Sequence, residues 1–284
     1  MHEQRPSQTD GEYQPPPPFP PPKPKAKGWR NAGGTAAGIG LLAAKFKTLL
    51  AFLLTFKWIF LGGKFLLSFG SIFASIWFYA LFYGWKLGIV IVLLVLVHEI
   101  GHWLAFRAFG TPVSLPYFIP GFAAFVAPKA PPPSPAHGAF AALMGPITGM
   151  AASGVCFAYG VATNNHFWFA AAYIGFFLNL FQLIPLVPFD GGRVAEIIDA
   201  RLFWVGLVVF ALFLAVIGLH SPFAWLLLLI VGVTALPRIR AALRGEISPV
   251  LAATPVRARV SLALGYFMTI AVGAIGAGVT MSLR

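Results

Sequence analysis

The chain has 284 residues, of which 58% are hydrophobic and only 10% are charged, and its mean hydropathy is +0.82. Soluble globular domains carry about 25% charged residues, so this composition excludes a soluble domain and indicates a polytopic membrane protein. The net charge of +12 does not indicate a nucleic-acid partner, because the basic residues lie in the N-terminal tail and in loops. In such places they set the topology and contact anionic lipid head groups.

The N-terminal segment, residues 1–44, is polar, then rich in proline (PPPPFPPPKPKAK, 15–27), then rich in glycine and alanine. A segment of this composition buries too little apolar surface to fold, so we expect a disordered cytoplasmic tail. In residues 45–64, lysines surround a short apolar stretch. This pattern predicts an amphipathic helix at the membrane interface.

The rest of the chain contains seven apolar runs, at 65–85, 87–106, 138–162, 167–188, 202–219, 222–236 and 260–282. They predict an all-α transmembrane domain over 65–284 with six or seven membrane-spanning helices, of which the short run at 222–236 would be tilted or half-inserted. With the N-terminus inside, only Lys86 and Arg284 of the 20 Lys and Arg residues fall outside. This asymmetry predicts a multi-pass protein of the cell membrane with a cytoplasmic N-terminus.

The loop between the second and third runs, residues 107–137, is apolar but too rich in proline and glycine for a helix (PYFIPGFAAFVAPKAPPPSP, 116–135). Irregular backbone at membrane depth is stable only where protein or a water-filled cavity satisfies its polar groups. We therefore expect a re-entrant segment, or a short hairpin around Phe118 to Val126, packed on the core.

The second run contains three ionisable residues in hydrocarbon surroundings, His98, Glu99 and His102 (VLVHEIGHWLAF, 95–106). On a helix, residues four apart share a face, so the two imidazoles are directed at one point and Glu99 can reach a water bound there. The pattern is typical of zinc hydrolases, in which zinc lowers the pKa of the water to about 7 and the glutamate removes its proton. Ionisable groups are costly inside a membrane, which disfavours a chance match but leaves a metal- or proton-transport site as an alternative.

A zinc site of this kind needs a third protein ligand and an open fourth position. Three acids lie between the HEIGH segment and the basic loop at 237–259, namely Asp190, Glu196 and Asp199. Asp190 follows Pro185 and Pro188, which break the fourth run, and precedes two glycines that let the backbone turn sharply. We expect Asp190 to be lifted off a regular helix at the depth of the histidines, and the other two acids to lie at the interface.

HEIGH on one run and QLIPLVPFDGG (182–192) on a later one resemble the site-2 protease family of intramembrane zinc metalloproteases. The second motif of that family reads Asn-x-x-Pro-x-x-Pro-x-Asp-Gly, and GPITG (145–149) resembles the Gly-Pro pair that the family carries between its two motifs. The resemblance covers about 87–194, which would form a catalytic core of three spans. It also implies that part of 107–137 offers an edge to an extended substrate.

Carried onto this sequence, the resemblance implies one Zn²⁺ per chain with His98, His102 and Asp190 as ligands and Glu99 as the catalytic base. The motif asparagine is Gln182 here, which keeps the amide but adds a methylene. In the family this amide helps to hold the substrate or the developing oxyanion, so Gln182 is a candidate substrate-binding residue. Asn179, three residues earlier on the same face, could share that role.

The expected function is hydrolysis of peptide bonds within or near transmembrane segments of membrane proteins, with the active site toward the cytoplasmic side. The expected partners are a transmembrane protein substrate and the lipid bilayer, and no nucleic acid. Two alternatives remain open. The same residues could serve a metal or proton transporter, and a catalytically inactive homologue could bind membrane segments, for which Gln182 is the one hint.

Overall fold

The computed structural model describes Lys47 and residues 64–218, 222–244 and 249–283. The predicted tail at 1–44 and nearly all of the predicted interfacial helix at 45–64 lie outside the described residues. The described elements are α2 (Lys64–Tyr83), α3 (Trp85–Ala108), β1 (Tyr117–Ile119), β2 (Ala123–Phe125), α4 (Pro135–Thr163), α5 (His166–Gln182), α6 (Asp190–Ile198), α7 (Leu202–Ile217), α8 (Pro222–Leu243), α9 (Pro249–Ala252) and α10 (Val256–Ser282).

Four of the described helices are long and apolar enough to cross a membrane: α3, α4, α10 and the part of α8 from Ala224 to Ala241. Helices α2 and α7 contain shorter apolar stretches, so a count of six or seven transmembrane helices stays a prediction. Helix α8 continues through Pro237 to Leu243 and is therefore longer than the run at 222–236 that was expected to be half-inserted. Hydropathy ended that run too early because the last turns of α8 carry arginines.

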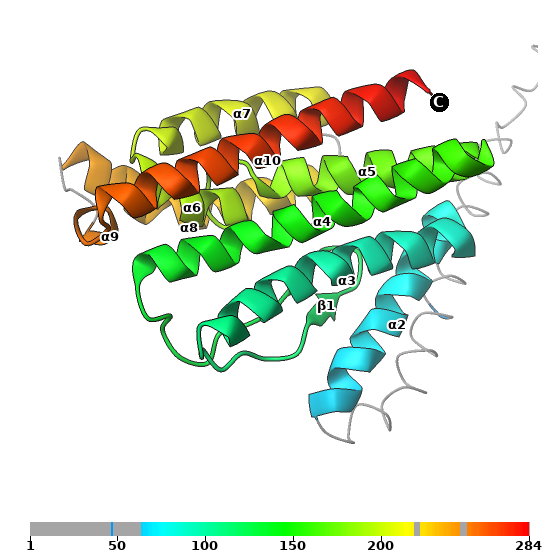
Figure 1. Cartoon of the computed structure of the whole chain (residues 1–284), viewed down its shortest axis with the longest axis horizontal. Coiled ribbons are helices and arrows are strands. Elements are labelled where there is room, and N and C mark those ends of the chain that lie inside the picture. Colours follow the sequence, from blue (N-terminus) through cyan, green and yellow to red (C-terminus); the bar gives the residue numbers. More distant parts are fainter. Residues whose placement is uncertain (1–46, 48–63, 219–221, 245–248, 284) are drawn as a thin grey trace, which may run out of the picture. The chain divides into compact units, whose positions relative to one another are not determined.

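The centre of the fold is formed by α3, α4 and α5, which pack side by side (Figure 1). Buried side chains from all three helices, such as Leu94, Met150 and Phe176, share one apolar cluster with Tyr266 of α10. Helices α3 and α4 approach closely where Thr148 Oγ1 donates to the Val97 carbonyl at 3.1 Å. Small residues permit such an approach between membrane helices.

The reversal that follows α5 differs from the sequence prediction at Asp190. Asp190 is the first residue of α6 and not a residue off a regular helix. An acidic residue is favoured in the first turn of a helix because it faces the positive end of the helix dipole. Gly191 and Gly192 are themselves helical, and a Cβ on either would overlap the backbone of the preceding turn, at Leu183 and Leu186. Because both residues lack a Cβ, α6 can pack closely against that turn.

Helices from the C-terminal half hold the segment that carries Asp190. The guanidinium of Arg238 in α8 pairs with Glu196 of α6, and Arg259 of α10 donates to the Ile198 carbonyl at 2.9 Å. The Tyr266 hydroxyl donates to the Leu183 carbonyl at 2.5 Å. Glu196 thus links α6 to α8.

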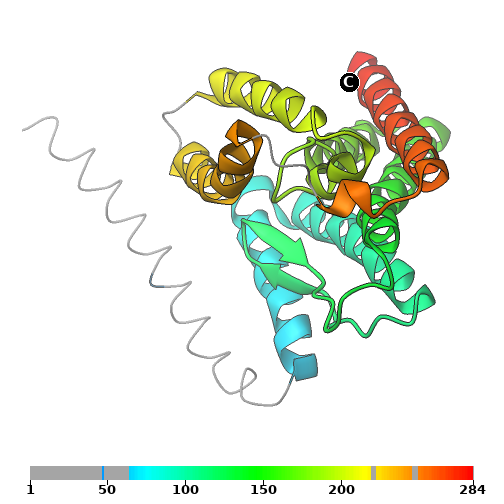
Figure 2. The same cartoon turned by 90° about the vertical axis from the view of Figure 1, so that its left-hand side faces the viewer.

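Residues 117–125 form a short antiparallel hairpin, in which Tyr117 lies opposite Phe125 and Ile119 opposite Ala123. Figure 2 shows this hairpin beside α2, and the two are joined by serines of that helix. Ser68 Oγ donates to the Pro116 carbonyl, and Ser71 Oγ accepts from the Phe118 N–H at 3.0 Å. Helix α2 therefore occupies the outer edge of β1.

Candidate metal centre

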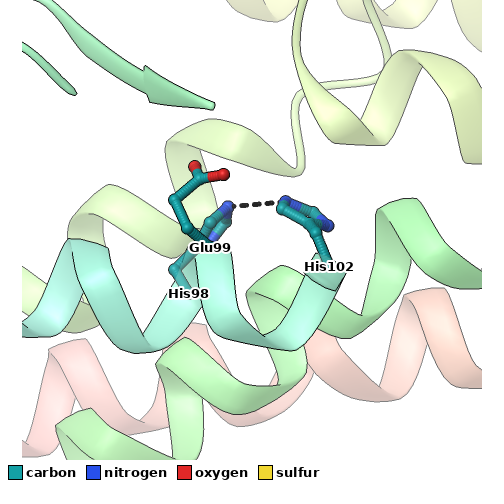
Figure 3. A group of neighbouring side chains, drawn as sticks. All are labelled: His98, Glu99 and His102. Carbon is teal, nitrogen blue, oxygen red and sulfur yellow. Dashed lines mark hydrogen bonds between the residues drawn. The ribbon is translucent and has the colours of Figure 1, made fainter. Parts of the chain in front are cut away.

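His98 and His102 lie one turn apart on α3, and both are buried. Figure 3 shows the two imidazoles turned toward each other, with the Glu99 carboxylate on the same side of the helix. The two Nε2 atoms are 3.0 Å apart. One ligand atom from each of His98, Glu99 and His102 lies within 4.8 Å of the others, so this group could hold a metal ion.

Asp190 reaches the same point from α6. Its Oδ2 lies 3.1 Å from His98 Nε2 and 3.2 Å from His102 Nε2. Three ligands that bind one zinc ion tetrahedrally at 2.0–2.2 Å are roughly 3.3 Å from one another. The two histidines and Asp190 thus form a tighter set of ligand atoms than the two histidines and Glu99.

Hydrogen bonds at the other ring nitrogens fix the tautomer of both histidines. His98 Nδ1 lies 2.8 Å from Asn179 Oδ1, and His102 Nδ1 lies 2.8 Å from the Ala141 carbonyl oxygen. Both oxygens only accept, so each neutral imidazole carries its proton on Nδ1 and has a lone pair on Nε2. Two such lone pairs and a carboxylate oxygen then face one another, and a cation satisfies all three. The residues present therefore fit a divalent metal.

Asp190 lies outside the candidate membrane spans, at the N-terminus of α6. Burial alone would raise the pKa of its carboxyl, but the imidazoles of His102 and His98 outweigh burial and hold that pKa below its usual range. Asp190 is therefore a carboxylate at neutral pH, which is the form that binds metals.

The Glu99 carboxylate accepts a hydrogen bond from the Val126 backbone N–H, which leaves one of its oxygens free. Its side chain is buried, and within the described part of the chain its Oε2 has no hydrogen-bond partner. A buried carboxylate oxygen without a partner is costly, and such cases call for an explanation. A water or a substrate group at the metal centre would supply the missing partner.

A cavity of about 480 Å³ adjoins the metal centre. It is lined by His98 and Glu99 of α3, by the hairpin residues 121–125, by the end of α5 and by α8. Gln182, the last residue of α5, lines this cavity, and its amide makes no hydrogen bond to the residues that the structure describes. Asn179 also lines it, but its amide is already bound to His98 and to the Gly175 carbonyl. Of the two candidate substrate-binding amides, that of Gln182 has no partner among the described residues, whereas that of Asn179 is already hydrogen-bonded at both ends.

Two glycines in the GPITG segment of α4 leave space for side chains of the candidate metal centre. A Cβ on Gly145 would overlap the His102 imidazole, and a Cβ on Gly149 would overlap the Asn179 amide. On the sequence alone, GPITG indicates only a resemblance to the Gly-Pro pair of the family. A signal for the further role is the glycine spacing, because residues four apart on α4 match the two histidines four apart on α3.

We predict that Gly145→Ala prevents normal metal binding, because the new methyl group would displace the His102 ring. Metal content and metal affinity of the purified variant measure this effect directly. Gly154→Ala is the matched control, since Gly154 lies on the same helix and a Cβ there meets nothing within 4 Å. Equal metal affinity in Gly145→Ala and Gly154→Ala would show that the close approach to His102 is unimportant.

Comparison with known families agrees with the site. Residues 86–165 match the model of Peptidase family M50, which is the site-2 protease family that the motifs resemble. The resemblance is thereby confirmed, and the family implies a metal-dependent protease of membranes. The match includes both histidines and Glu99 and ends before Gln182 and Asp190. No curated protein matches the chain.

Proposed function

We propose that the protein is an intramembrane zinc metalloprotease that hydrolyses peptide bonds within or near transmembrane segments of membrane proteins. The observation that carries this proposal is the convergence of His98, His102 and Asp190 on one point beside the Glu99 carboxylate, whose Oε2 has no partner among the described residues. Structural zinc sites use all four positions for protein ligands, whereas catalytic sites keep one position open. Three ligands beside a carboxylate with one unpartnered oxygen match the catalytic arrangement.

In this proposal His98, His102 and Asp190 hold the zinc ion, which when bound polarises the substrate carbonyl and acidifies a water. Glu99 accepts the proton of that water through its free oxygen. The same carboxyl then returns the proton to the leaving nitrogen. The walls of the cavity are predominantly apolar, and such surroundings strengthen each of these electrostatic contacts.

The hairpin supports an extended substrate on β2. Phe118 and Ala124 lie opposite each other, and the Phe118 N–H points away from β2, toward Ser71. In an antiparallel pair the two opposite residues behave alike, so the N–H and C=O of Ala124 also point outward. Ala124 lines the cavity, and the serines of α2 bond to the β1 side of the hairpin. We propose that an unwound peptide segment pairs with this edge of β2, as in strand addition.

Two further polar groups are available to a peptide in the cavity. Gln182 can donate from its amide, and we propose that it binds a substrate carbonyl or the developing oxyanion. Ser75 of α2 also lines the cavity, and its buried Oγ has no hydrogen-bond partner among the residues described. A peptide backbone, which carries a donor and an acceptor at most residues, matches such groups.

We further propose a multi-pass protein of the cell membrane with the active site toward the cytoplasmic side. Arg107 lies in the last turn of α3, beyond the histidines, and Arg240 lies in the last turn of α8. The opposite end of α3 begins at Trp85, beside Tyr83. Aromatic side chains favour the membrane interface, and arginines favour the cytoplasmic side. The bilayer is thus one partner and a transmembrane protein substrate the other.

The polar lining of the cavity favours hydrolysis over transport. Its ionisable residues in the described structure are Tyr79, His98 and Glu99. A transport path would need polar groups that continue to the other side of the membrane. The rest of the lining is predominantly apolar, which suits a pocket for a membrane segment.

We expect the purified full-length protein to contain about one zinc ion per chain and to cleave a model transmembrane substrate. A zinc chelator should stop cleavage, and added zinc should restore it. Measurement of bound metal and of cleavage products in the same preparation tests both parts. Zinc binding without cleavage of any helical or unwound membrane segment would favour the inactive homologue, and zinc flux through vesicles that carry the protein would favour transport.

A further inference from the structure

We propose that Asn179 is a positioning residue that orients His98 for metal binding, in a space kept open by Gly149, and that it does not contact the substrate. This rests on the proposed function in that the metal is taken to be zinc. It replaces the expectation that Asn179 shares the substrate-binding role of Gln182.

Both ends of the Asn179 amide have partners. Its Nδ2 donates to the Gly175 carbonyl, one turn earlier on α5, at 2.8 Å. This donor contact fixes which end is oxygen, so the acceptor Oδ1 must face His98 Nδ1, at 2.8 Å. The residue is only 3% exposed. Asn179 therefore has its position set by its own helix and presents one acceptor to His98.

The acceptor determines what His98 can do. A proton held on Nδ1 leaves Nε2 as the metal-binding atom, and the hydrogen bond fixes the plane of the ring. His98 Nε2 then points to His102 Nε2 and to Asp190. Without the acceptor, the ring could rotate or carry its proton on Nε2, and either change would remove a ligand.

The two histidines differ in how their orientation is secured. His102 Nδ1 faces the backbone carbonyl of Ala141, which no side-chain substitution removes. His98 relies on a side chain from a helix that lies far along the sequence. Asn179 is therefore the orienting contact that substitution can delete while leaving all of the proposed ligands in place.

Gly149 secures the position of Asn179 from the other side. A Cβ on Gly149 would overlap the oxygen, carbon and nitrogen of the Asn179 amide. Ser153 of the same helix donates to the Gly149 carbonyl at 2.7 Å, and a Cβ on Gly175 would overlap Ser153 Oγ. Helices α4 and α5 are thus in close contact around Asn179, which leaves the amide one place to lie.

The test compares zinc affinity, by competition with a chromophoric chelator, in the wild type and four single variants of the full-length protein. Loss of a hydrogen bond to a metal-binding histidine typically weakens metal affinity by about 10–100-fold. We expect a weakening of this size in Asn179→Leu, which keeps the number of side-chain heavy atoms but loses the acceptor, and in Gly149→Ala, which displaces the amide. Asn179→Asp keeps an acceptor and should bind zinc more tightly than Asn179→Leu. Gly154→Ala should match the wild type.

A second readout separates orientation from general damage to the fold. The visible spectrum of the Co²⁺-loaded protein should change in Asn179→Leu and stay close to the wild-type spectrum in Asn179→Asp. Thermal unfolding of the metal-free forms reports on folding. If Asn179→Leu does not fold, Asn179→Asp and Gly149→Ala decide, and a folded Gly149→Ala with wild-type zinc affinity overturns the proposal.

The substrate-binding alternative predicts a different result. Folded Asn179→Leu would then bind zinc and Co²⁺ normally but bind a transmembrane peptide more weakly, and that outcome also overturns the proposal. Failure of the proposed function is separable, because a wild type that binds zinc but cleaves nothing leaves the affinity comparison intact. A wild type that binds no divalent metal overturns both.

Discussion

Glu99→Gln should leave zinc bound and lower the rate of cleavage by about 10²–10⁴-fold, the range that general acid–base catalysis contributes. Glutamine has nearly the shape of glutamate, so the buried side chain still fits beside His98 and His102. It cannot accept a proton from the attacking water. Single-turnover cleavage of a transmembrane substrate, measured together with metal content, checks both halves of this expectation.

Two results would contradict that reading of Glu99. If Glu99→Gln lost its zinc, Glu99 would be a ligand, and the group of His98, Glu99 and His102 would be the metal site. If the variant cleaved at the wild-type rate, the proton would be taken by another group. Gln182→Asn serves as a control that keeps an amide at the cavity, and we expect it to retain zinc and much of the activity.

Asp190→Ala should reduce zinc affinity on the order of 10²-fold or more, beyond the range typical for loss of a contact around the ligands. The carboxylate lies within 3.2 Å of both Nε2 atoms, so its removal takes away one of three converging ligands. It also removes the negative charge that offsets the metal ion. Cleavage should be lost in parallel and should return only partly at high zinc concentration.

Asp199→Ala is the matched control for Asp190→Ala. Asp199 lies at the other end of α6, is exposed, and accepts a hydrogen bond from the Arg201 N–H. We expect this variant to bind zinc as the wild type does. Full zinc retention in Asp190→Ala would show that the third ligand lies elsewhere, with Glu99 as the first candidate to examine.

The parts of the site that were predictable from sequence were those encoded by local spacing. His98 and His102 share a face because residues four apart on any helix do. Asp190 was singled out by the prolines and glycines around it and then by the resemblance, but its place as the first residue of α6 was not predicted. The prolines and glycines around Asp190 predicted a sharp turn at the two glycines. In the structure both glycines pack against residues 183–187 and belong to helix α6.

Other features have no signature in a single sequence. The Ala141 carbonyl that orients His102 is a backbone group, so the residue type at position 141 gives no sign of this contact. The polarity of Asn179 suggested a functional role, but its contact with His98 has no signature in the sequence. The hairpin was foreseen from composition, yet the serines of α2 that occupy one of its edges became visible only when the two segments were placed together.

The distance along the chain between the metal ligands has a consequence for assembly. His98 on α3 and Asp190 on α6 are 92 residues apart in sequence, and their side chains are in contact. An ion bound by both closes a loop of that length, much as a disulfide does, and removes the conformational freedom of an open loop from the partly assembled chain. Because one ligand lies on α3 and another on α6, the ion is retained tightly only after α4, α5 and α6 have taken their places. A metal ion at this site would thus act as a late cross-link that favours the completed helix bundle over its unfinished forms, and the proposed peptide hydrolysis would become available only when that bundle is complete.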